Sequence, residues 1–231
     1  MNKKINISII GTRGYPYVYS GYETFVKQLS ERLVLKDCNV TVYCHKGLFE
    51  IRPKEIKGIK LVYIPTSETK ILSQPIHSFL SIIHACFSNT DVVLVVNSAN
   101  GPFGILTKLV RIPTAINVDG LEWLRPKWKG LGSIYFKWAS RMATLFSDQI
   151  INDSDEMRKV YLDLFKRDSK VIAYGADIRK SKNLDLINKW NLKQREYYLI
   201  IGRLIPDNNA DLIINGFLKS NSKKKLVIVG D

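Results

Sequence analysis

A glycine-rich stretch near the N-terminus has the residue types and spacing that bind phosphate. Residues 11–23 are GTRGYPYVYSGYE, and they follow a strand-like apolar run at residues 5–10. Apolar side chains then recur at helical spacing, at residues 22, 25, 26, 29 and 33. The glycines are therefore predicted to lie at a strand-to-helix turn, where free backbone N–H groups and the helix dipole favour an anionic ligand.

Other interpretations of this stretch remain open. Ser20 and Glu23 also fit a capping box, in which Glu23 satisfies backbone donors with or without a ligand role. Arg13 is either a phosphate contact or an ordinary surface arginine. The glycine spacing is not G-x-G-x-x-G, so the dinucleotide-binding fingerprint is absent. By itself the stretch predicts a phosphate or sugar ligand, with a plain turn as the alternative.

Composition and charge limit the class of protein. The chain has 231 residues, of which 45% are hydrophobic and 24% charged, as in ordinary globular proteins. Its 35 Lys and Arg residues outnumber 21 Asp and Glu residues, for a net charge of +14. Such an excess favours an anionic partner, although a generally basic composition would explain it too. No helix-turn-helix, RNP or zinc pattern is present, so we expect no nucleic-acid partner.

Cysteine and histidine usage argues against metal and disulfide chemistry. The three cysteines form no C-x-x-C pair, which is typical of a reducing compartment. The three histidines have no metal-ligand spacing, so no metal site is predicted. The N-terminal residues lack a signal-peptide pattern, and no run of about 18 apolar residues occurs. The expected location is cytoplasmic.

The order of predicted elements defines the fold class. Strand and helix patterns alternate through the first part of the chain, which favours a parallel sheet with helices on both faces. The predicted strands are residues 5–10, 40–44, 60–64, 92–96, 114–118, 149–152 and 170–173. The predicted helices are residues 23–35, 76–87, 103–110, 135–146 and 156–165. We therefore expect an α/β, Rossmann-like doubly wound domain.

A second domain is predicted to begin after a polar stretch. Strand, helix and strand patterns return at residues 197–201, 212–218 and 226–229. This is the opening of a second, incomplete Rossmann-like domain, because one βαβ unit cannot cover both faces of a sheet. The predicted boundaries are an N-terminal domain at residues 1–178, a linker at 179–195, and the start of a C-terminal domain at 196–231.

Several motifs resemble those of a known family. They are Gly11-Thr12-Arg13-Gly14-Tyr15-Pro16 with Ser20-Gly21-Tyr22-Glu23-Thr24-Phe25, Asn117-Val118-Asp119-Gly120-Leu121-Glu122-Trp123, Ile151-Asn152-Asp153-Ser154, Tyr174-Gly175-Ala176-Asp177, and Gly202-Arg203-Leu204. Together they resemble bacterial family 4 glycosyltransferases of the rhamnosyltransferase type, almost from end to end. The Asp-Gly-Leu-Glu-Trp segment is the most specific of them.

The resemblance implies a GT-B fold, in which an acceptor-side domain faces a donor-binding domain. It implies retaining transfer of a sugar, L-rhamnose, from a nucleotide-diphosphate donor, with no metal or other cofactor. The implied acceptor is a lipid-linked saccharide at the inner face of the plasma membrane, in capsule or cell-wall polysaccharide synthesis.

The same resemblance implies the site residues. Asp119 lies near the reacting sugar as the catalytic candidate, although Asp119-Gly120 also fits a simple turn. Glu122 and Trp123 line the acceptor pocket, with a core role for Trp123 as the rival interpretation. The donor contacts implied or predicted are Arg13, Gly14, Ser20, Gly21, Glu23 and Arg203.

The chain departs from the family pattern in its C-terminal half. A family member has a whole donor-binding domain, whereas here the second domain ends at Asp231. We therefore expect this chain to be inactive alone. The alternative function is a catalytically silent domain that binds acceptor lipid or a partner chain.

Basic and aromatic residues interleave between residues 123 and 141. This mixture is typical of a segment that lies on an anionic membrane surface, where aromatic rings sit at the headgroups and cations meet anionic lipid. A half-buried helix with a solvated cationic face is the alternative.

Overall fold

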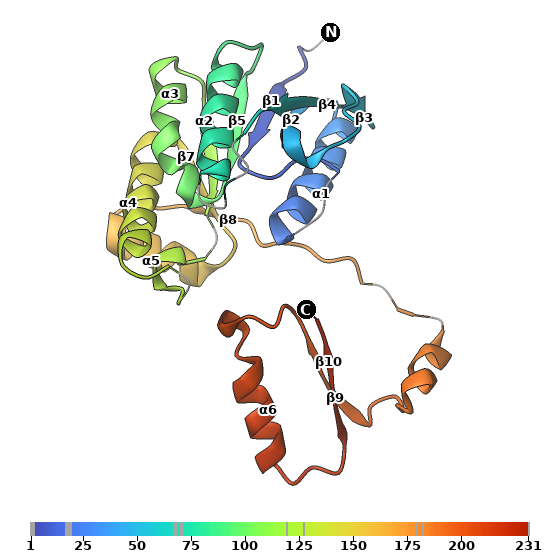
Figure 1. Ribbon diagram of the computed structural model, residues 1–231. Coiled ribbons are helices and arrows are strands. Elements are labelled where there is room, and N and C mark those ends of the chain that lie inside the picture. The colour runs from blue at the N-terminus through green and yellow to red at the C-terminus, as the bar shows by residue number, and fades with distance from the viewer. Residues whose placement is uncertain are drawn as a thin grey trace. The chain divides into compact units, whose positions relative to one another are not determined.

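The computed structural model describes residues 3–230 apart from 17–19, 67–68, 70–71, 119, 127, 179 and 182. The chain divides into two compact units, visible in Figure 1. The first comprises Met1–Leu124 and Gly130–Tyr174, and the second comprises Arg125–Lys129 and Gly175–Asp231.

The first unit is built on an eight-stranded sheet of order β3-β4-β2-β1-β5-β6-β7-β8. Every neighbouring pair is parallel except β3 with β4. The strands are β1 (Asn6–Ile10), β2 (Asn39–His45), β3 (Glu55–Ile56), β4 (Ile59–Ile64), β5 (Val92–Val96), β6 (Thr114–Val118), β7 (Gln149–Asn152) and β8 (Lys170–Val171). The predicted α/β class with a mostly parallel, Rossmann-like sheet is thus confirmed.

Helices connect these strands (Figure 1). The α-helices are α1 (Gly21–Leu35), α2 (Ser73–Cys86), α3 (Gly104–Leu109), α4 (Leu131–Phe146) and α5 (Asp155–Phe165). Short 3₁₀ helices are η1 (Lys46–Leu48), η2 (Ser98–Phe103) and η3 (Glu122–Leu124). Ser154 caps α5, because its Oγ accepts a hydrogen bond from the backbone N–H of Met157.

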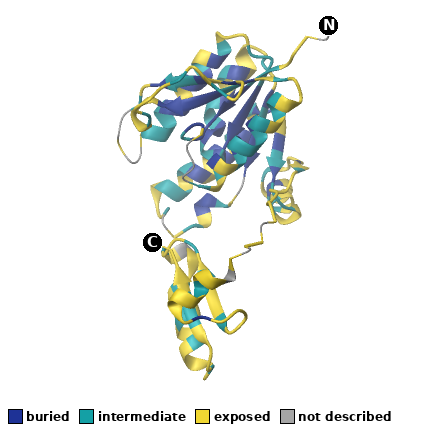
Figure 2. Cartoon of the chain, turned by 90° about the vertical axis from the view of Figure 1, so that its right-hand side faces the viewer, coloured by how far each residue is buried: buried dark blue, intermediate teal, exposed yellow. Residues whose placement is uncertain are grey.

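The apolar face of α1 packs against one face of the sheet. Val26 is fully buried there, and the partly buried Phe25, Leu29 and Leu33 pack around it. Since side chains alternate across a strand, only every second residue of each strand joins this core. The buried members from the strands are Ile9, Val40, Val42, Cys44, Ile59, Leu61, Leu94 and Val96. Figure 2 shows the resulting band of buried strands in the first unit.

Two differences from the predicted elements have simple causes, and a third has no explanation in the structure. β3 has only two residues, which is too short to produce a recognisable alternation. α4 begins at Leu131 rather than at residue 135, because Gly130 takes a left-handed conformation (φ 61°) that ends the preceding loop. β8 ends at Val171 rather than at residue 173, although residues 172 and 173 are apolar.

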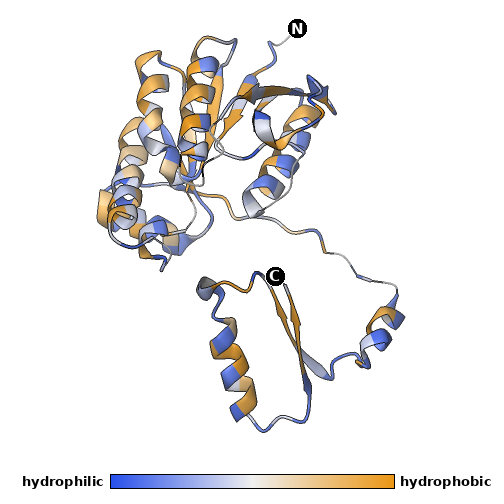
Figure 3. Cartoon of the chain, viewed as in Figure 1, coloured by the Kyte–Doolittle hydropathy of each residue, from blue (hydrophilic) through white to orange (hydrophobic). Residues whose placement is uncertain are grey.

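The second unit contains a parallel pair of strands, β9 (Tyr197–Ile201) and β10 (Lys225–Val229), joined by α6 (Ala210–Lys219). This is the predicted βαβ arrangement. η4 (Leu184–Trp190) and η5 (Pro206–Asn208) are 3₁₀ helices, and η4 lies where the sequence predicts only a polar stretch. The strands are apolar (Figure 3). Leu192 is nevertheless the one described residue of this unit that is buried.

None of the helices in the described ranges is long and apolar enough to cross a membrane.

Candidate functional site at the carboxyl edge of the first sheet

The loop between β1 and α1 is shaped by two glycines that no other residue could replace without strain. Gly11 has φ 106°, and a Cβ there would lie 2.3 Å from the carbonyl oxygen of Val96. Gly14 has φ 129°, and a Cβ there would lie 2.8 Å from the Sγ of Cys44. Both conformations are rare for residues with a side chain. The loop therefore lies directly on the ends of β2 and β5.

Glu23 holds the two ends of this loop together. Its carboxylate is buried and accepts hydrogen bonds from the backbone N–H of Arg13, at 3.1 Å, and of Ser20, at 3.0 Å. The hydroxyl of Ser20 donates to the same carboxylate. The capping interpretation of Ser20 and Glu23 is confirmed, and a ligand role for Glu23 stays a prediction.

Gly21 is the first residue of α1, and its surroundings differ from those of Gly11 and Gly14. A Cβ built on Gly21 meets no atom within 4 Å. Nothing in the described part of the chain therefore requires glycine here. The open space lies at the helix N-terminus, where free backbone N–H groups attract anions.

A pair of histidines that is not among the predicted site residues adjoins the loop. His45 ends β2, and its backbone N–H donates to the carbonyl of Arg13 at 3.1 Å. Its imidazole stacks on that of His77 from α2, with ring centroids 3.8 Å apart. Both rings are buried. The position of His45 directly after the predicted strand at residues 40–44 is the sequence signal that could have identified it.

Burial determines the protonation of this pair. Loss of hydration is the main reason why the pKa of His45 is lowered to about 4. The hydrogen bond with Gln74 raises this pKa, the nearby Arg13 guanidinium lowers it, and Glu23 raises it. Burial lowers the pKa of His77 to about 3, with His45 as the second cause. Both imidazoles are therefore neutral at pH 7. His45 Nε2 lies 3.2 Å from the Oε1 of Gln74.

Two asparagines and a tyrosine organise the ends of β5 and β6. Asn100 is buried and donates to the carbonyl of Val96 at 2.7 Å, beside Gly11. At the end of β6, the buried Asn117 accepts a hydrogen bond from the hydroxyl of Tyr174 at 2.9 Å. Tyr174 also packs edge-on against Phe25 of α1, with centroids 5.2 Å apart. These contacts join the predicted Tyr-Gly-Ala-Asp motif to the same edge of the sheet.

The predicted catalytic residue, Asp119, lies outside the described residues, as does Lys127. Gly120 follows in a left-handed turn (φ 71°), and a Cβ there would lie 3.6 Å from the Oε1 of Glu122. Glu122 is buried. Trp123 is buried too, with its ring edge-on to Phe165 at 6.1 Å. This packing matches the core alternative for Trp123, while its pocket role stays a prediction.

The predicted site residues fall into two groups. The first unit brings together Arg13, Gly14, Ser20, Gly21 and Glu23 in one loop. Arg203 belongs to the second unit, where it follows β9 and its carbonyl accepts a hydrogen bond from Asn208 at 2.7 Å. Arg203 is exposed.

The three cysteines are free, with Cys44 buried and Cys38 and Cys86 half-buried. Burial raises the pKa of the Cys44 thiol to about 11. Within the described ranges, no three His, Cys, Asp or Glu side chains are placed to hold a metal ion.

Comparison with solved structures places the fold among those of nucleotide-sugar-dependent enzymes of GT-B architecture. A sucrose-phosphate synthase from Thermosynechococcus elongatus matches with a TM-score of 0.75 at 14% identity, covering 98% of this chain and 62% of the other. HepE from Anabaena, in complex with UDP and glucose, matches with a TM-score of 0.69 at 14% identity, covering 98% and 61%. UGT89C1 from Arabidopsis thaliana, in complex with UDP-L-rhamnose, matches with a TM-score of 0.54 at 13% identity, covering 100% and 71%. The chain thus spans less than two thirds of the first two structures.

A family model defines the relationship more narrowly. The chain belongs to the family described as "Domain of unknown function (DUF1972)", whose model matches residues 4–177. No curated protein sequence gives a significant match.

Proposed function

We propose that the protein is a glycosyltransferase that moves a sugar from a nucleotide-diphosphate donor to a saccharide acceptor. The proposed donor sugar is L-rhamnose, the proposed acceptor is a lipid-linked saccharide at the cytoplasmic face of the membrane, and the transfer is of the retaining type. The product enters capsule or cell-wall polysaccharide. The first unit is the acceptor-side domain, and the second unit belongs to the donor-binding domain.

The observation that carries this proposal is the open space at Gly21. The sequence keeps glycine at the start of α1, although alanine would meet nothing within 4 Å and is the better helix former. Glycine at this position leaves the backbone open to close approach by a ligand. Backbone N–H groups at a helix start suit the diphosphate of a donor. Three structures with related folds contain UDP or a UDP-sugar, which supports this ligand class.

In the proposed mechanism, the chain supplies charge and position. Backbone N–H groups of the Gly11–Gly21 loop stabilise the charge that develops on the departing diphosphate. Arg203 of the second unit stays a predicted diphosphate contact. Asp119 follows β6 and orients the acceptor hydroxyl or takes its proton. Tyr174 holds the side chain of Asn117 in β6 by a hydrogen bond.

Membrane contact is the second part of the proposal, and α4 supports it. Leu131, Ile134 and Trp138 are exposed on this helix, at 85%, 67% and 48%, beside the exposed Lys137 and Arg141. An apolar groove of about 390 Å³ lies between α4 and the end of α5 and is lined by Ile134, Lys137, Trp138, Arg141, Leu164 and Phe165. Exposed apolar residues flanked by cations suit the interface of an anionic membrane.

The experiment that tests the transfer reaction uses labelled dTDP-L-rhamnose and UDP-sugars with bacterial membranes as acceptor. We expect a form with a whole donor-binding domain to place label in the lipid fraction, and the 231-residue chain alone to place none there. Asp119→Asn should lower turnover by about two orders of magnitude, because a positioned proton acceptor or orienting group is lost. Asp163→Asn, at an exposed position of α5, is the matched control. Turnover of Asp119→Asn close to that of the control would contradict the assignment.

A further inference from the structure

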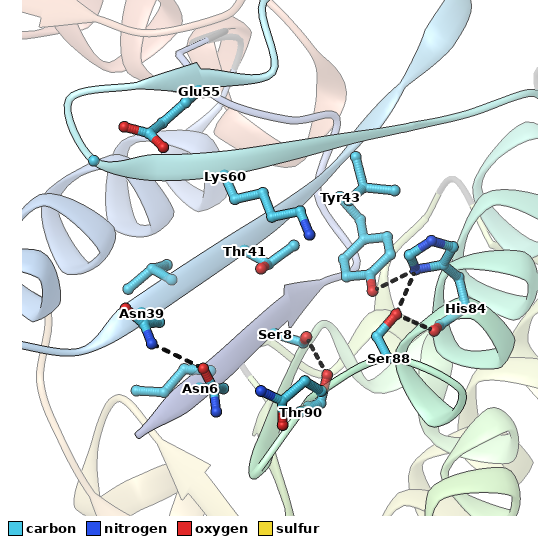
Figure 4. Close-up of a pocket in the computed structure, with 15 residues that line it drawn as sticks. Asn6, Ser8, Asn39, Thr41, Tyr43, Glu55, Lys60, His84, Ser88 and Thr90 are labelled. Atoms are coloured by element: carbon cyan, nitrogen blue, oxygen red, sulfur yellow. Dashed lines mark hydrogen bonds between the residues drawn. The ribbon is translucent and has the colours of Figure 1, made fainter. Parts of the chain in front are cut away.

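A second pocket lies on the opposite face of the first sheet, toward the amino ends of its strands. Val40 and Val42 of β2 pack under α1. Because side chains alternate along a strand, the neighbouring Thr41 and Tyr43 point to the other face and line this pocket. Ser8 of β1 and Lys60 of β4 line the same pocket (Figure 4). The Gly11–Gly21 loop leaves the carboxyl end of β1, so this pocket is separate from the proposed reaction site.

The polar character of the strands that line the pocket sets them apart from a typical doubly wound sheet. Strands that helices cover on both faces are apolar on both faces. Here the face that lines the pocket is polar, with the pattern N-T-Y along residues 39, 41 and 43 of β2.

The floor of the pocket is built from paired polar side chains. The hydroxyls of Ser8 and Thr90 lie 2.9 Å apart. The Tyr43 hydroxyl lies 3.0 Å from Nδ1 of His84, and the Ser88 hydroxyl lies 3.1 Å from the same nitrogen (Figure 4). Ser8 and Tyr43 are buried. These hydrogen bonds fix the orientation of the groups that line the pocket, which is what a binding site requires.

Two further polar groups of the pocket have no protein partner. Within the described ranges, neither the Thr41 hydroxyl nor the Lys60 ammonium makes a hydrogen bond or an ion pair. Lys60 extends over Thr41 toward Tyr43 (Figure 4). Glu55 stands opposite Lys60 in the β3–β4 register and also lines the pocket, so the charges of the lining balance. Carboxamide groups complete the lining, from Asn6, Asn39 and Asn89.

We propose that this pocket binds an uncharged, hydroxyl-rich small molecule, the size of one or two sugar rings. Its volume of about 330 Å³ is at the small end of the range for ligand sites. Hydroxyls and carboxamides can each donate and accept, which matches the dual character of sugar hydroxyls. A lining without net charge gives no preference for an anion. The inference does not depend on the proposed transfer reaction, because it rests on other residues at the other end of the strands.

An NMR titration of the ¹⁵N-labelled 231-residue chain tests this inference, with D-glucose, maltose and glucose 1-phosphate as probes. Glucose and maltose should shift the amide signals of Ser8, Thr41, Ser88 and Thr90. Thr41→Val should weaken maltose binding about fivefold, as expected for one neutral hydrogen bond. Lys60→Met should weaken it about tenfold, as expected for a charged donor. Lys54→Met, on an exposed lysine outside the pocket, should leave binding unchanged.

Three results would overturn the inference. The first is that neither glucose nor maltose shifts the four pocket amide signals. The second is that Thr41→Val and Lys60→Met both bind maltose as tightly as Lys54→Met does. The third is that glucose 1-phosphate shifts these signals and glucose does not. Lys60 is an exposed side chain, so its replacement tests the pocket even if Thr41→Val disturbs the strand.

Discussion

Single residues decide how close a ligand can come to the backbone at the carboxyl edge of the first sheet. Gly11 and Gly14 are required by the packing of the protein itself, because a side chain would collide with Val96 and Cys44. Gly21 is not required in this way. The open space at Gly21 is at the start of a helix, where a ligand can approach the backbone, whereas the space at Gly11 and Gly14 is filled by other atoms of the protein. The sequence contains all three glycines but does not separate these two roles, because only the surrounding atoms do so.

The histidine pair gives the fold a dependence on pH. In the unfolded chain a histidine has a pKa near 6.5, whereas His45 and His77 have folded values of about 4 and about 3. The unfolded state therefore binds more protons below pH 6.5, and the free energy of unfolding falls as pH is lowered through this range. Between pH 7 and pH 4 each histidine should remove about 3 kcal/mol.

Urea unfolding at pH 7, 5.5 and 4.5 measures this effect. His77→Leu should show a shallower loss of stability with acidification than the unchanged chain, because one titrating group is gone. His84→Gln, at an exposed histidine, should keep the steep dependence. An identical pH dependence in His77→Leu and the unchanged chain would contradict the role of the pair. If that variant fails to fold, His45→Gln provides the same comparison.

At the scale of elements, the sequence predicts most of what the structure contains. The apolar repeat at residues 22, 25, 26, 29 and 33 identifies α1, and the run at residues 92–96 identifies a strand buried on both faces. The elements that were missed are short. β3 and η4 lack a periodic apolar pattern, so the sequence does not predict them.

The candidate site is less predictable than the fold. The glycine loop follows from the position of Gly11 after a strand, but the burial of Glu23 by backbone donors does not follow from composition. The stacking of His45 on His77 joins β2 to α2, two elements distant in sequence. Only the three-dimensional arrangement brings these rings within 3.8 Å.

The helix α4 carries the prediction of membrane contact. Each exposed Lys or Arg near an anionic surface contributes about 1 kcal/mol, and salt screens this attraction. Replacing Lys137 and Arg141 together by Glu should therefore reduce co-sedimentation with phosphatidylglycerol vesicles by at least about tenfold at low salt. The control is the double variant Lys36→Glu with Lys54→Glu, which changes the net charge by the same amount at exposed sites outside α4. Equal loss in both double variants would assign the effect to net charge alone.

The whole molecule combines a well-buried first unit with a second unit whose apolar side chains are largely exposed. Ile201, Leu212 and Leu218 are 73%, 64% and 69% exposed around the β9–α6–β10 arrangement. The match with the sucrose-phosphate synthase structure covers 98% of this chain but only 62% of that structure. In a two-domain transferase the donor is held by groups from both domains. The contribution of the first unit is therefore best isolated by a change confined to its glycine loop.

Calorimetric titration of nucleotide sugars into the unchanged chain, Gly21→Ala and Gly216→Ala tests the central proposal most directly. Gly216 lies inside α6, and a Cβ there also meets nothing within 4 Å, so both variants should fold with equal or slightly higher thermal stability. We predict that Gly21→Ala weakens donor binding at least about tenfold, because a methyl group then separates the diphosphate from the backbone N–H groups. Gly216→Ala should bind like the unchanged chain. Donor affinity that is the same in Gly21→Ala as in the unchanged chain would contradict the account.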